Sequence, residues 1–356
     1  MLSEQEKKRY ARHIILPEVG LKGQQKLKQA KVLVIGAGGL GCPVLQYITA
    51  AGIGTIGIVD FDTVDESNLQ RQVLYATEDI GKHKAAVAKE KLQKQNPYIS
   101  FIAHISHLTF VNALDIISGY DMVVDGSDNF ATRYLVNDVC VMLNKVLVFG
   151  SIFKFDGQVS VFNYNGGSTY RCLYPEPPAA GEVPNCAETG VIGVLPGITG
   201  TLMANEIIKL ITHVGEVLSE KLLTFDALTM QFNTFTIKPN PSNRSIKELI
   251  DYDIFCGTIN EISAEELKEK LKCKEDFQLV DVRELHEYEI KNIGGILIPL
   301  NQLEDRLTKL NKEKEVIVHC ASGARSKKAI AILKEHGFTK VYNLQNGLLD
   351  FETSFL

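Results

Sequence analysis

The feature that most constrains the fold is a glycine-rich turn between an apolar strand and a helix. Lys31–Ile35 reads KVLVI, a short buried strand, and GAGGLG follows at residues 36–41. Apolar residues then recur at helical spacing over residues 40–48, and a second strand, Ile56–Val59, ends at Asp60. The order strand, glycine turn, helix, strand predicts a βαβ unit whose turn brings backbone N–H groups close to a phosphate.

The alternation of strands and helices continues beyond this unit. A helix is expected over residues 82–95, and apolar strands are expected at 99–103, 122–125 and 146–149. The chain is therefore predicted to be an α/β protein with a Rossmann-like, doubly wound and mostly parallel sheet. Residues 158–164 alternate like an antiparallel strand, so we expect antiparallel additions. Further elements are a helix over 3–12 started by a capping box at Ser3–Glu6, a loop over 169–190, a helix over 198–211 and a strand over 222–225.

A change of composition divides the chain, whose 356 residues are too many for one average domain. Residues 238–243 read KPNPSN, and a second capping box, Ser263–Glu266, follows. A shorter strand and helix series comes next, with strands expected at 277–281, 315–320 and 340–344. We expect a nucleotide-binding domain over 1–240, a linker over 241–257 and a smaller α/β domain over 258–356.

Charged residues that follow the glycine turn in the sequence indicate which of its possible ligands it binds. The turn by itself suits NAD, FAD, S-adenosylmethionine or ATP, with Asp60 placed to bind ribose hydroxyls. ATP that is attacked at its α-phosphate needs cations for the pyrophosphate leaving group and a carboxylate for Mg²⁺. Arg71, Lys84 and Asp128 fit these roles. The pattern therefore favours ATP and Mg²⁺ over a dinucleotide.

Four motifs carry a family resemblance: GAGGLG at 36–41, VDFDTVDESNLQRQ at 59–72, GKHK at 81–84 and DGSDNF at 125–130. With them, residues 1–240 resemble the ThiF/MoeB family of ubiquitin-activating-enzyme-like adenylyltransferases. The resemblance implies a homodimer that adenylates the C-terminal glycine of a ubiquitin-like sulfur carrier protein. It implies that Arg12 reaches the ATP held by the other subunit and that Asp128 holds Mg²⁺. The other implied ATP-binding residues are Gly36, Gly38, Gly39, Gly41, Asp60, Asp62, Asn68, Arg71, Gln72, Lys84 and Asn129.

The long loop and its flanks contain two cysteines, Cys172 and Cys186, whose roles can be compared with those in the family. In the family, a cysteine at the place of Cys186 engages the activated carboxylate or a persulfide. Many relatives also bind zinc through two C-x-x-C pairs. Here Cys172 matches one position of the first pair but Thr169 occupies the other, and Ser242–Asn243 stand where the second pair begins. Structural zinc takes four thiolate or imidazole ligands, so we expect no structural zinc.

The second domain places a cysteine where a strand meets a helix. The apolar strand 316–320 ends in Cys320, and ASGARS at 321–326 turns into a helix. Backbone N–H groups and the helix N-terminus favour a thiolate or an anionic persulfide there, and Arg325 adds positive charge. A phosphatase loop is the alternative, since His319 precedes the cysteine. The DVRE segment at 281–284 favours a rhodanese domain, which residues 258–356 resemble. That resemblance implies a persulfide on Cys320 and a loop oriented by Arg325.

The two halves together predict an adenylyltransferase with a sulfurtransferase domain. Its product would be a thiocarboxylate on the carrier, for molybdopterin, thiamine or tRNA thiolation, with a cysteine desulfurase as sulfur donor. The expected catalytic residues are Arg71, Lys84, Cys186, Cys320 and Arg325. Three alternatives remain: an adenylating dehydratase-type relative acting on a small molecule or modified tRNA, an NAD-dependent redox enzyme, and a non-catalytic scaffold.

Composition bears on partners and compartment. The net charge of −5 does not favour nucleic acid binding, and no apolar run has the length of a membrane span. The first ten residues, MLSEQEKKRY, lack the apolar region of a signal peptide. The seven cysteines include no C-x-x-C pair, which is typical of a reducing compartment. We therefore expect a cytoplasmic protein.

Overall fold

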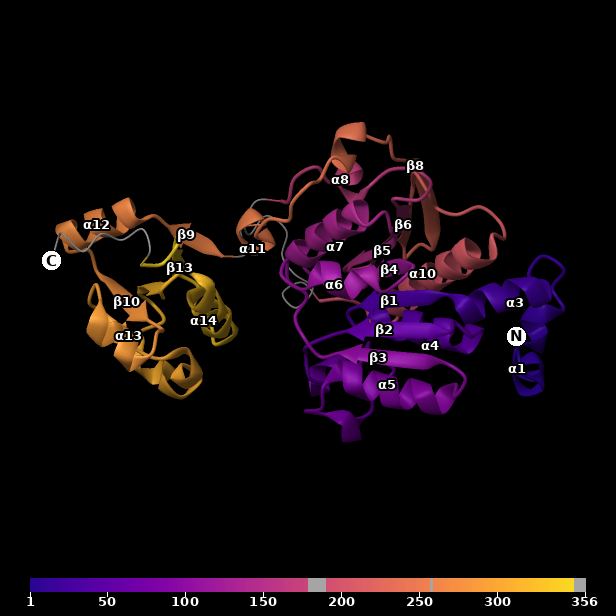
Figure 1. Ribbon diagram of the computed structural model, residues 1–356, viewed down its shortest axis with the longest axis horizontal. Coiled ribbons are helices and arrows are strands. Elements are labelled where there is room, and N and C mark those ends of the chain that lie inside the picture. Colours follow the sequence, from indigo (N-terminus) through magenta and orange to yellow (C-terminus); the bar gives the residue numbers. More distant parts are fainter. Residues whose placement is uncertain (179–189, 257–258, 349–356) are drawn as a thin grey trace. The chain divides into compact units, whose positions relative to one another are not determined.

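The computed structural model describes residues 1–178, 190–256 and 259–348, and the chain divides into two compact units (Figure 1). The units are Met1–Tyr252 and Asp253–Leu356. The division falls within the stretch that we expected to link two domains. None of the helices in the described ranges is both long enough and apolar enough to cross a membrane.

The first unit is built on an eight-stranded sheet with the order β3-β2-β1-β4-β5-β6-β7-β8. Strands β1 to β5 run parallel, and β5 to β8 are joined as antiparallel neighbours. The strands are β1 (Lys31–Ile35), β2 (Thr55–Val59), β3 (Ser100–His104), β4 (Met122–Asp125), β5 (Val146–Phe153), β6 (Asp156–Phe162), β7 (Lys221–Asp226) and β8 (Gln231–Thr236). This sheet confirms the predicted fold class: a mostly parallel α/β sheet with antiparallel additions.

Helices cover both faces of this sheet because successive side chains of a buried strand point to opposite faces. On one face, Val32 and Val34 share a core with α4, α5 and α10. On the other, Phe149 packs against Phe162 and against Tyr170 of α8. The helices of this unit are α1 (Glu4–Arg9), α2 (Ala11–Ile14), α3 (Gly20–Gln29), α4 (Gly41–Ala51), α5 (Lys84–Gln95), α6 (Ala113–Ser118), α7 (Phe130–Met142), α8 (Tyr170–Leu173) and α10 (Leu195–Thr212), with short 3-10 turns η1 (Glu66–Asn68), η2 (Thr77–Asp79) and η3 (Pro241–Arg244). The short helix α11 (Tyr252–Phe255) begins at the last residue of this unit and continues into the second.

Local sequence signals set most of these boundaries. The Ser3 capping box is present, since Glu6 N donates to Ser3 Oγ (3.2 Å) and Ser3 N donates to Glu6 Oε2 (2.7 Å). The helix expected over 3–12 is interrupted at Tyr10, which ends α1 before α2 begins. Two elements were not predicted: the short helix α8 inside the expected loop and the edge strand β8, whose residues are all exposed.

The first unit continues past residue 240 through specific contacts. Arg244 donates to Asn163 Oδ1 and to the carbonyl oxygen of Gly167. Tyr252 is buried, and its hydroxyl lies 2.7 Å from Asp138 Oδ2. These contacts explain why the compact unit reaches Tyr252.

The second unit has a five-stranded parallel sheet with the order β11-β10-β12-β13-β9. Its strands are β9 (Asn260–Ile262), β10 (Phe277–Asp281), β11 (Ile296–Leu297), β12 (Glu315–His319) and β13 (Val341–Leu344). Its helices are α12 (Ala264–Cys273), α13 (Leu285–Ile290) and α14 (Ala324–Glu335), with the turns η4 (Leu300–Gln302) and η5 (Glu304–Lys309). The three strands expected from the sequence are β10, β12 and β13, and the Ser263–Glu266 capping box starts α12.

Candidate functional site

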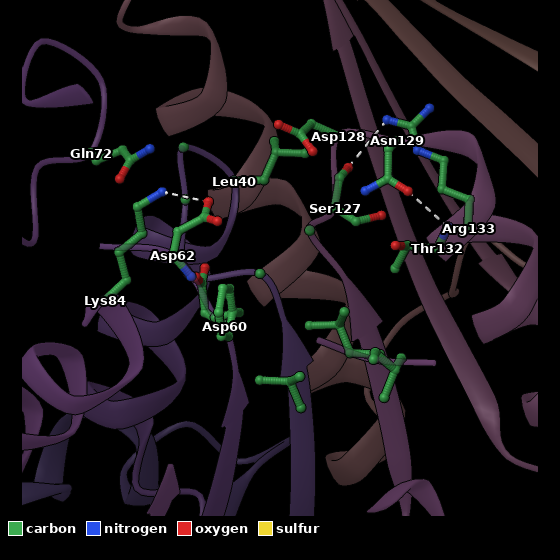
Figure 2. Close-up of a pocket in the computed structure, with 18 of the residues that line it drawn as sticks. Leu40, Asp60, Asp62, Gln72, Lys84, Ser127, Asp128, Asn129, Thr132 and Arg133 are labelled. Carbon is green, nitrogen blue, oxygen red and sulfur yellow. Dashed lines mark hydrogen bonds and ion pairs between the residues drawn. The ribbon is translucent and has the colours of Figure 1, made fainter. Parts of the chain in front are cut away.

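A pocket of about 1030 Å³, part of it open to solvent, lies at the carboxyl ends of β1, β2 and β4 (Figure 2). This edge of a parallel sheet is where α/β proteins bind ligands. Ten of the predicted nucleotide-binding residues line it: Gly36, Gly38, Gly39, Asp60, Asp62, Arg71, Gln72, Lys84, Asp128 and Asn129. Gly41, Asn68 and Arg12 are not among its lining residues.

The glycine turn has no room for side chains at two positions. Gly36 has φ of 84°, and a Cβ there would lie 2.8 Å from the carbonyl oxygen of Gly126. A Cβ on Gly41 would lie 1.9 Å from the carbonyl oxygen of Gly36. Gly41 therefore acts behind the pocket, where it lets α4 start directly against the turn. The close packing leaves the backbone of the turn facing the pocket at the start of α4.

Asp60 joins the glycine turn to the end of β2. Its Oδ2 accepts a hydrogen bond from Ala37 N (2.7 Å), and its Oδ1 accepts one from Asp62 N (2.9 Å). Burial raises the pKa of Asp60, and the Ala37 hydrogen bond and Lys84 oppose that rise. Both carboxylate oxygens retain lone pairs that can accept from hydroxyl groups of a ligand.

Lys84 occupies a position where a positive charge destabilises the folded protein. It is the first residue of α5, where the helix dipole opposes a cation, and only 6% of it is exposed. Its Nζ lies 3.0 Å from Asp62 Oδ2, and Asp62 is largely exposed (Figure 2). A buried ammonium with one exposed partner at the pocket wall can bind an anionic ligand.

A short turn brings two more predicted residues to the pocket. Arg71 N and Gln72 N both donate to the carbonyl oxygen of Asn68, which ends η1. Asn68 therefore positions the turn from outside the pocket lining. Gln72 is buried, and its Oε1 has no hydrogen-bond partner in the part of the chain that the structure describes. A buried amide oxygen without a partner at a pocket wall fits a ligand that supplies a donor.

The segment after β4 presents one carboxylate and buries another. Asp125 is fully buried, and its Oδ1 accepts from Ser127 N (2.9 Å) and Ser127 Oγ (2.6 Å). Burial raises the pKa of Asp125. Asp128 is exposed at the pocket, and Asn129 uses its side-chain oxygen to cap α7 at Thr132 N (2.9 Å). Asp128 is thus the acidic side chain that this turn offers to a metal ion.

Sequence reasoning missed Arg133, which lies across the pocket from Lys84 (Figure 2). Arg133 Nη2 donates to the carbonyl oxygen of Ser127 (3.2 Å), and its guanidinium group stacks near Phe130 and Phe149. Its buried Nε has no hydrogen-bond partner within the described residues. The signal that could have found it is its place one helical turn after the N-cap Asn129, on the same side as the pocket.

In the second unit, Cys320 directly follows β12 and precedes α14. The thiol is buried, and Gly323 N donates to its Sγ at 3.2 Å. Gly323 has φ of 90° and forms the cap of α14. Burial works to raise the pKa of Cys320, but hydrogen bonds from Ser326 and from backbone N–H groups of Ser322 and Arg325 bring it below its usual value. The loop therefore favours the thiolate.

Arg325 does not act as a free cation beside this thiol. Its Nη1 and Nη2 lie 2.6 Å from Glu287 Oε2 and Oε1, a bidentate ion pair with α13. His319 is fully buried, and burial lowers its pKa to about 4. Among described residues its two ring nitrogens have no hydrogen-bond partner. A neutral imidazole in this place is a packing residue next to the nucleophile.

Comparison with known proteins follows the same division of the chain. The sequence model of the ThiF family matches residues 10–246. The chain belongs to the ThiF family. A second model, the rhodanese-like domain, matches residues 263–354 and decides against the phosphatase alternative.

Two relatives cover more than nine tenths of the chain, and a third covers 72% of it. The probable adenylyltransferase/sulfurtransferase MoeZ of Mycobacterium tuberculosis is 46% identical over 98% of this chain and 93% of its own length. The adenylyltransferase and sulfurtransferase MOCS3 of Drosophila sechellia is 41% identical over 92% of this chain and 78% of its own. The sulfur carrier protein adenylyltransferase of Thermus thermophilus is 52% identical over 72% of this chain and 98% of its own. This ThiF-family chain is an adenylyltransferase with a sulfurtransferase domain.

Solved structures resemble about two thirds of this chain in fold. Escherichia coli MccB, in a crystal structure with ATP, has a TM-score of 0.59 and 24% sequence identity, covering 67% of this chain and 73% of that one. MccB in a crystal structure with MccA-N7isoASN gives a TM-score of 0.60 over 67% of this chain and 74% of that one. The likeness shows the fold alone.

The positions that we compared with zinc-binding C-x-x-C pairs gather around one thiol, that of Cys172. Cys172 Sγ accepts hydrogen bonds from Thr169 N (3.3 Å), Asn240 N (3.3 Å) and Asn243 Nδ2 (3.6 Å), and lies 3.4 Å from Thr169 Oγ1. Burial works to raise the pKa of Cys172, and these hydrogen bonds lower it overall. Residues far apart in sequence are thus joined here by hydrogen bonds to a single sulfur atom.

The remaining predicted residues are Arg12 and Cys186. Arg12 is exposed on α2, outside the pocket of its own chain. Cys186 lies outside the described residues. The chain re-enters the described part at Gly190, and the next residue, Val191, lines the pocket.

Proposed function

We propose that this enzyme adenylates the C-terminal glycine of a ubiquitin-like sulfur carrier protein and then gives it sulfur from a persulfide on Cys320. The observation that carries the proposal is a pocket lined by Arg71 and buried Lys84 in the same chain as a thiol cradled by backbone N–H groups. The carrier is proposed because a relative that covers 72% of this chain at 52% identity is named a sulfur carrier protein adenylyltransferase.

The first step joins the carrier carboxylate to AMP. A carboxylate oxygen attacks the α-phosphorus, the bond to the β-phosphate oxygen breaks, and pyrophosphate leaves. Asp60 would hold the ribose hydroxyls, while the glycine turn at the start of α4 would face the phosphates. Lys84 and Arg71 would stabilise the charge that develops on the leaving pyrophosphate.

The proposed reaction also uses Mg²⁺, and Asp128 is the residue that would bind it. Bound there, the ion would neutralise phosphate charge and withdraw electrons from the reacting phosphorus. The exposed carboxylate suits an oxygen-seeking cation, whereas the neighbouring Asp125 is committed to hydrogen bonds from Ser127. Asn129 is placed beside it, with its side-chain oxygen used by the α7 cap.

The second step transfers sulfur. The terminal sulfur of the Cys320 persulfide attacks the acyl carbon, and AMP leaves with the electron pair of the carbon–oxygen bond. We assign the next exchange to Cys186: its thiolate attacks the Cys320 sulfur, which releases the carrier thiocarboxylate and leaves a Cys186–Cys320 disulfide. A cellular dithiol would reduce that disulfide for the next cycle. Arg325 would orient the Cys320 loop through its pair with Glu287.

The remaining assignments rest on the family and on the thiols. We propose a homodimer in which Arg12 reaches the other subunit's ATP, because Arg12 is exposed and absent from its own pocket. We propose a cysteine desulfurase as sulfur donor. A cytoplasmic location suits Cys42, Cys140, Cys172, Cys273 and Cys320, which are free thiols. In place of zinc, the hydrogen bonds to Cys172 would hold residues 169 and 240–243 together.

ATP–pyrophosphate exchange with purified protein and candidate carriers tests the first step. We expect exchange that requires a carrier ending in Gly-Gly and is lost in Arg71→Ala. Mass spectrometry of the carrier after addition of a sulfur donor should then find the thiocarboxylate, and Cys320→Ser should abolish it. Absence of exchange with every such carrier would refute the carrier assignment and favour a small molecule or modified tRNA as the adenylated substrate.

A further inference from the structure

The loop around Cys320 contains one cationic side chain, and that side chain is held in an ion pair. Between Cys320 and Arg325 the sequence is CASGAR, so Arg325 is the one charged residue of this loop. Its guanidinium group makes two 2.6 Å contacts with the carboxylate of Glu287. Such a planar, two-point pair satisfies the charge of both groups. An anion that approaches the thiol therefore meets a compensated cation.

Glu287 is held in this position by its own helix. Its Oε2 also accepts a hydrogen bond from Glu284 N at the start of α13. The backbone of α13 is fixed in turn by buried Arg283, which donates to the carbonyl oxygens of Glu287 and Lys291 and pairs with Asp281. Glu287 thus faces Arg325 as part of a preorganised unit.

The charge of Glu287 persists under all ordinary conditions. Its hydrogen bonds to Arg325 lower its pKa to about 2. Neither of two described basic residues close to the loop in sequence, His319 and Lys327, supplies a free cation. His319 is neutral, because burial lowers its pKa to about 4, and Lys327 lies 3.8 Å from Glu261. The loop therefore stays compensated throughout the physiological pH range.

We propose that Glu287 determines which sulfur donors load Cys320. By compensating Arg325 it disfavours dianionic donors such as thiosulfate, while a persulfide group on a thiol, which carries less charge, is accepted. The inference deepens the proposed function, since it rests on Cys320 as the sulfur-carrying residue. Glu287 acts through Arg325 and is a positioning residue.

The chemistry of loading is the same substitution at sulfur for both donors. The Cys320 thiolate attacks the outer sulfur of a thiol persulfide, the donor S–S bond breaks, and the donor thiolate leaves with its electron pair. With thiosulfate, the same attack expels sulfite. In each case the Cys320 persulfide forms without net oxidation or reduction. The two donors differ in their leaving group and in their charge, and charge is what the Glu287–Arg325 pair controls.

The test measures the rate of Cys320 loading in the full-length protein. Persulfide on Cys320 is quantified by mass spectrometry after alkylation, with thiosulfate or cysteine persulfide as donor. Glu287→Gln removes the charge at nearly constant shape, and Glu289→Gln removes one charge from an exposed site of the same helix as the matched control. Glu287→Asp keeps the charge near Arg325.

We expect Glu287→Gln to raise thiosulfate loading about tenfold, from the Coulomb energy of a dianion at the loop in a partly solvated site. Cysteine persulfide has half the charge, so its loading should rise only about threefold, the square root of that factor. Glu289→Gln should match wild type. Glu287→Asp should keep the wild-type preference, whereas a purely structural role would make both Glu287 variants equally impaired.

Unchanged thiosulfate loading in folded Glu287→Gln would overturn the inference. If that variant does not fold, Ser322→Lys gives the second test, because it adds a cation to an exposed loop position and leaves the Glu287–Arg325 pair intact. It should raise thiosulfate loading selectively, and failure to do so would also overturn the inference. Wild-type protein that loads from neither donor would instead refute the proposed role of Cys320.

Discussion

Replacing Lys84 should lower the activity of this enzyme without lowering its stability. The substitution Lys84→Met keeps a long unbranched side chain and removes the charge. Lys84 is 6% exposed, stands at the N-terminus of α5 and pairs only with the exposed Asp62 within the described part of the chain. A cation in such a place is costly for the folded protein, because burial and the helix dipole both disfavour it.

The effect on adenylation follows from the charge that Lys84 would meet. A unit charge about 4 Å from a phosphate oxygen in a site of effective dielectric constant about 20 contributes up to about 4 kcal/mol. Loss of one such contact in an enzyme typically lowers the rate about 10²–10³-fold. We therefore expect ATP–pyrophosphate exchange in Lys84→Met to fall by about that factor. The thermal midpoint should stay equal to wild type or rise by about 2–4 °C, the shift that about 1 kcal/mol gives in a domain of this size.

The matched control is Lys82→Met, two residues earlier on the exposed surface. It removes the same charge beside the same helix, and its only ion pair in the described residues, with Asp79, is long at 3.8 Å. Exchange should stay within about twofold of wild type. A folded Lys84→Met protein that keeps more than about a tenth of wild-type exchange would refute the assignment of Lys84 to the pyrophosphate.

Three further predictions concern stability. Tyr252→Phe should cost about 1.5–3 kcal/mol in the free energy of unfolding, because its hydroxyl bonds the buried Asp138 carboxylate; a cost below about 0.5 kcal/mol in chemical unfolding would contradict this. The pKa of Glu287 is lowered from 4.5 to about 2 in the folded protein, so its contribution to stability should be complete above pH 4.5 and lost as the pH falls towards 2. Hydrogen-exchange rates of β10 and β12 in wild type and in Glu287→Gln should therefore converge over that range, and a difference that stays constant would refute this contribution. A chelator should leave the thermal midpoint unchanged, because hydrogen bonds to Cys172 hold that region, and a chelator-dependent drop would show a structural metal.

Elements with strong local signals were predictable. The strands at 31–35, 122–125 and 277–281 match the expected bounds because each is a buried apolar run in a parallel sheet. The edge strand β8 was missed because all of its residues are exposed, so its sequence has no alternation of buried and exposed side chains. It is a strand because its backbone pairs with β7. The short helix α8 was missed for a similar reason: four residues are too few to show helical periodicity.

The pocket shows the same division. Motif residues at 36–41, 59–72 and 125–130 converge because the carboxyl ends of neighbouring parallel strands meet at one edge. Arg133 and the partnerless oxygen of Gln72 became visible only through burial and hydrogen bonds, which depend on packing around the site. The sequence alone does not show whether an arginine or a glutamine will be buried without a hydrogen-bond partner.

By itself, the sequence determined the two α/β units, the glycine turn, the cations near it and the thiol at the end of β12. These features depend on side-chain periodicity and on neighbours a few residues apart, which a linear pattern records. Only the tertiary structure decided that Arg325 is compensated by Glu287, 38 residues earlier, and that Cys172 gathers Asn240 and Asn243. Such pairs form because folding excludes water and forces buried charges and thiols to find partners wherever the chain brings them.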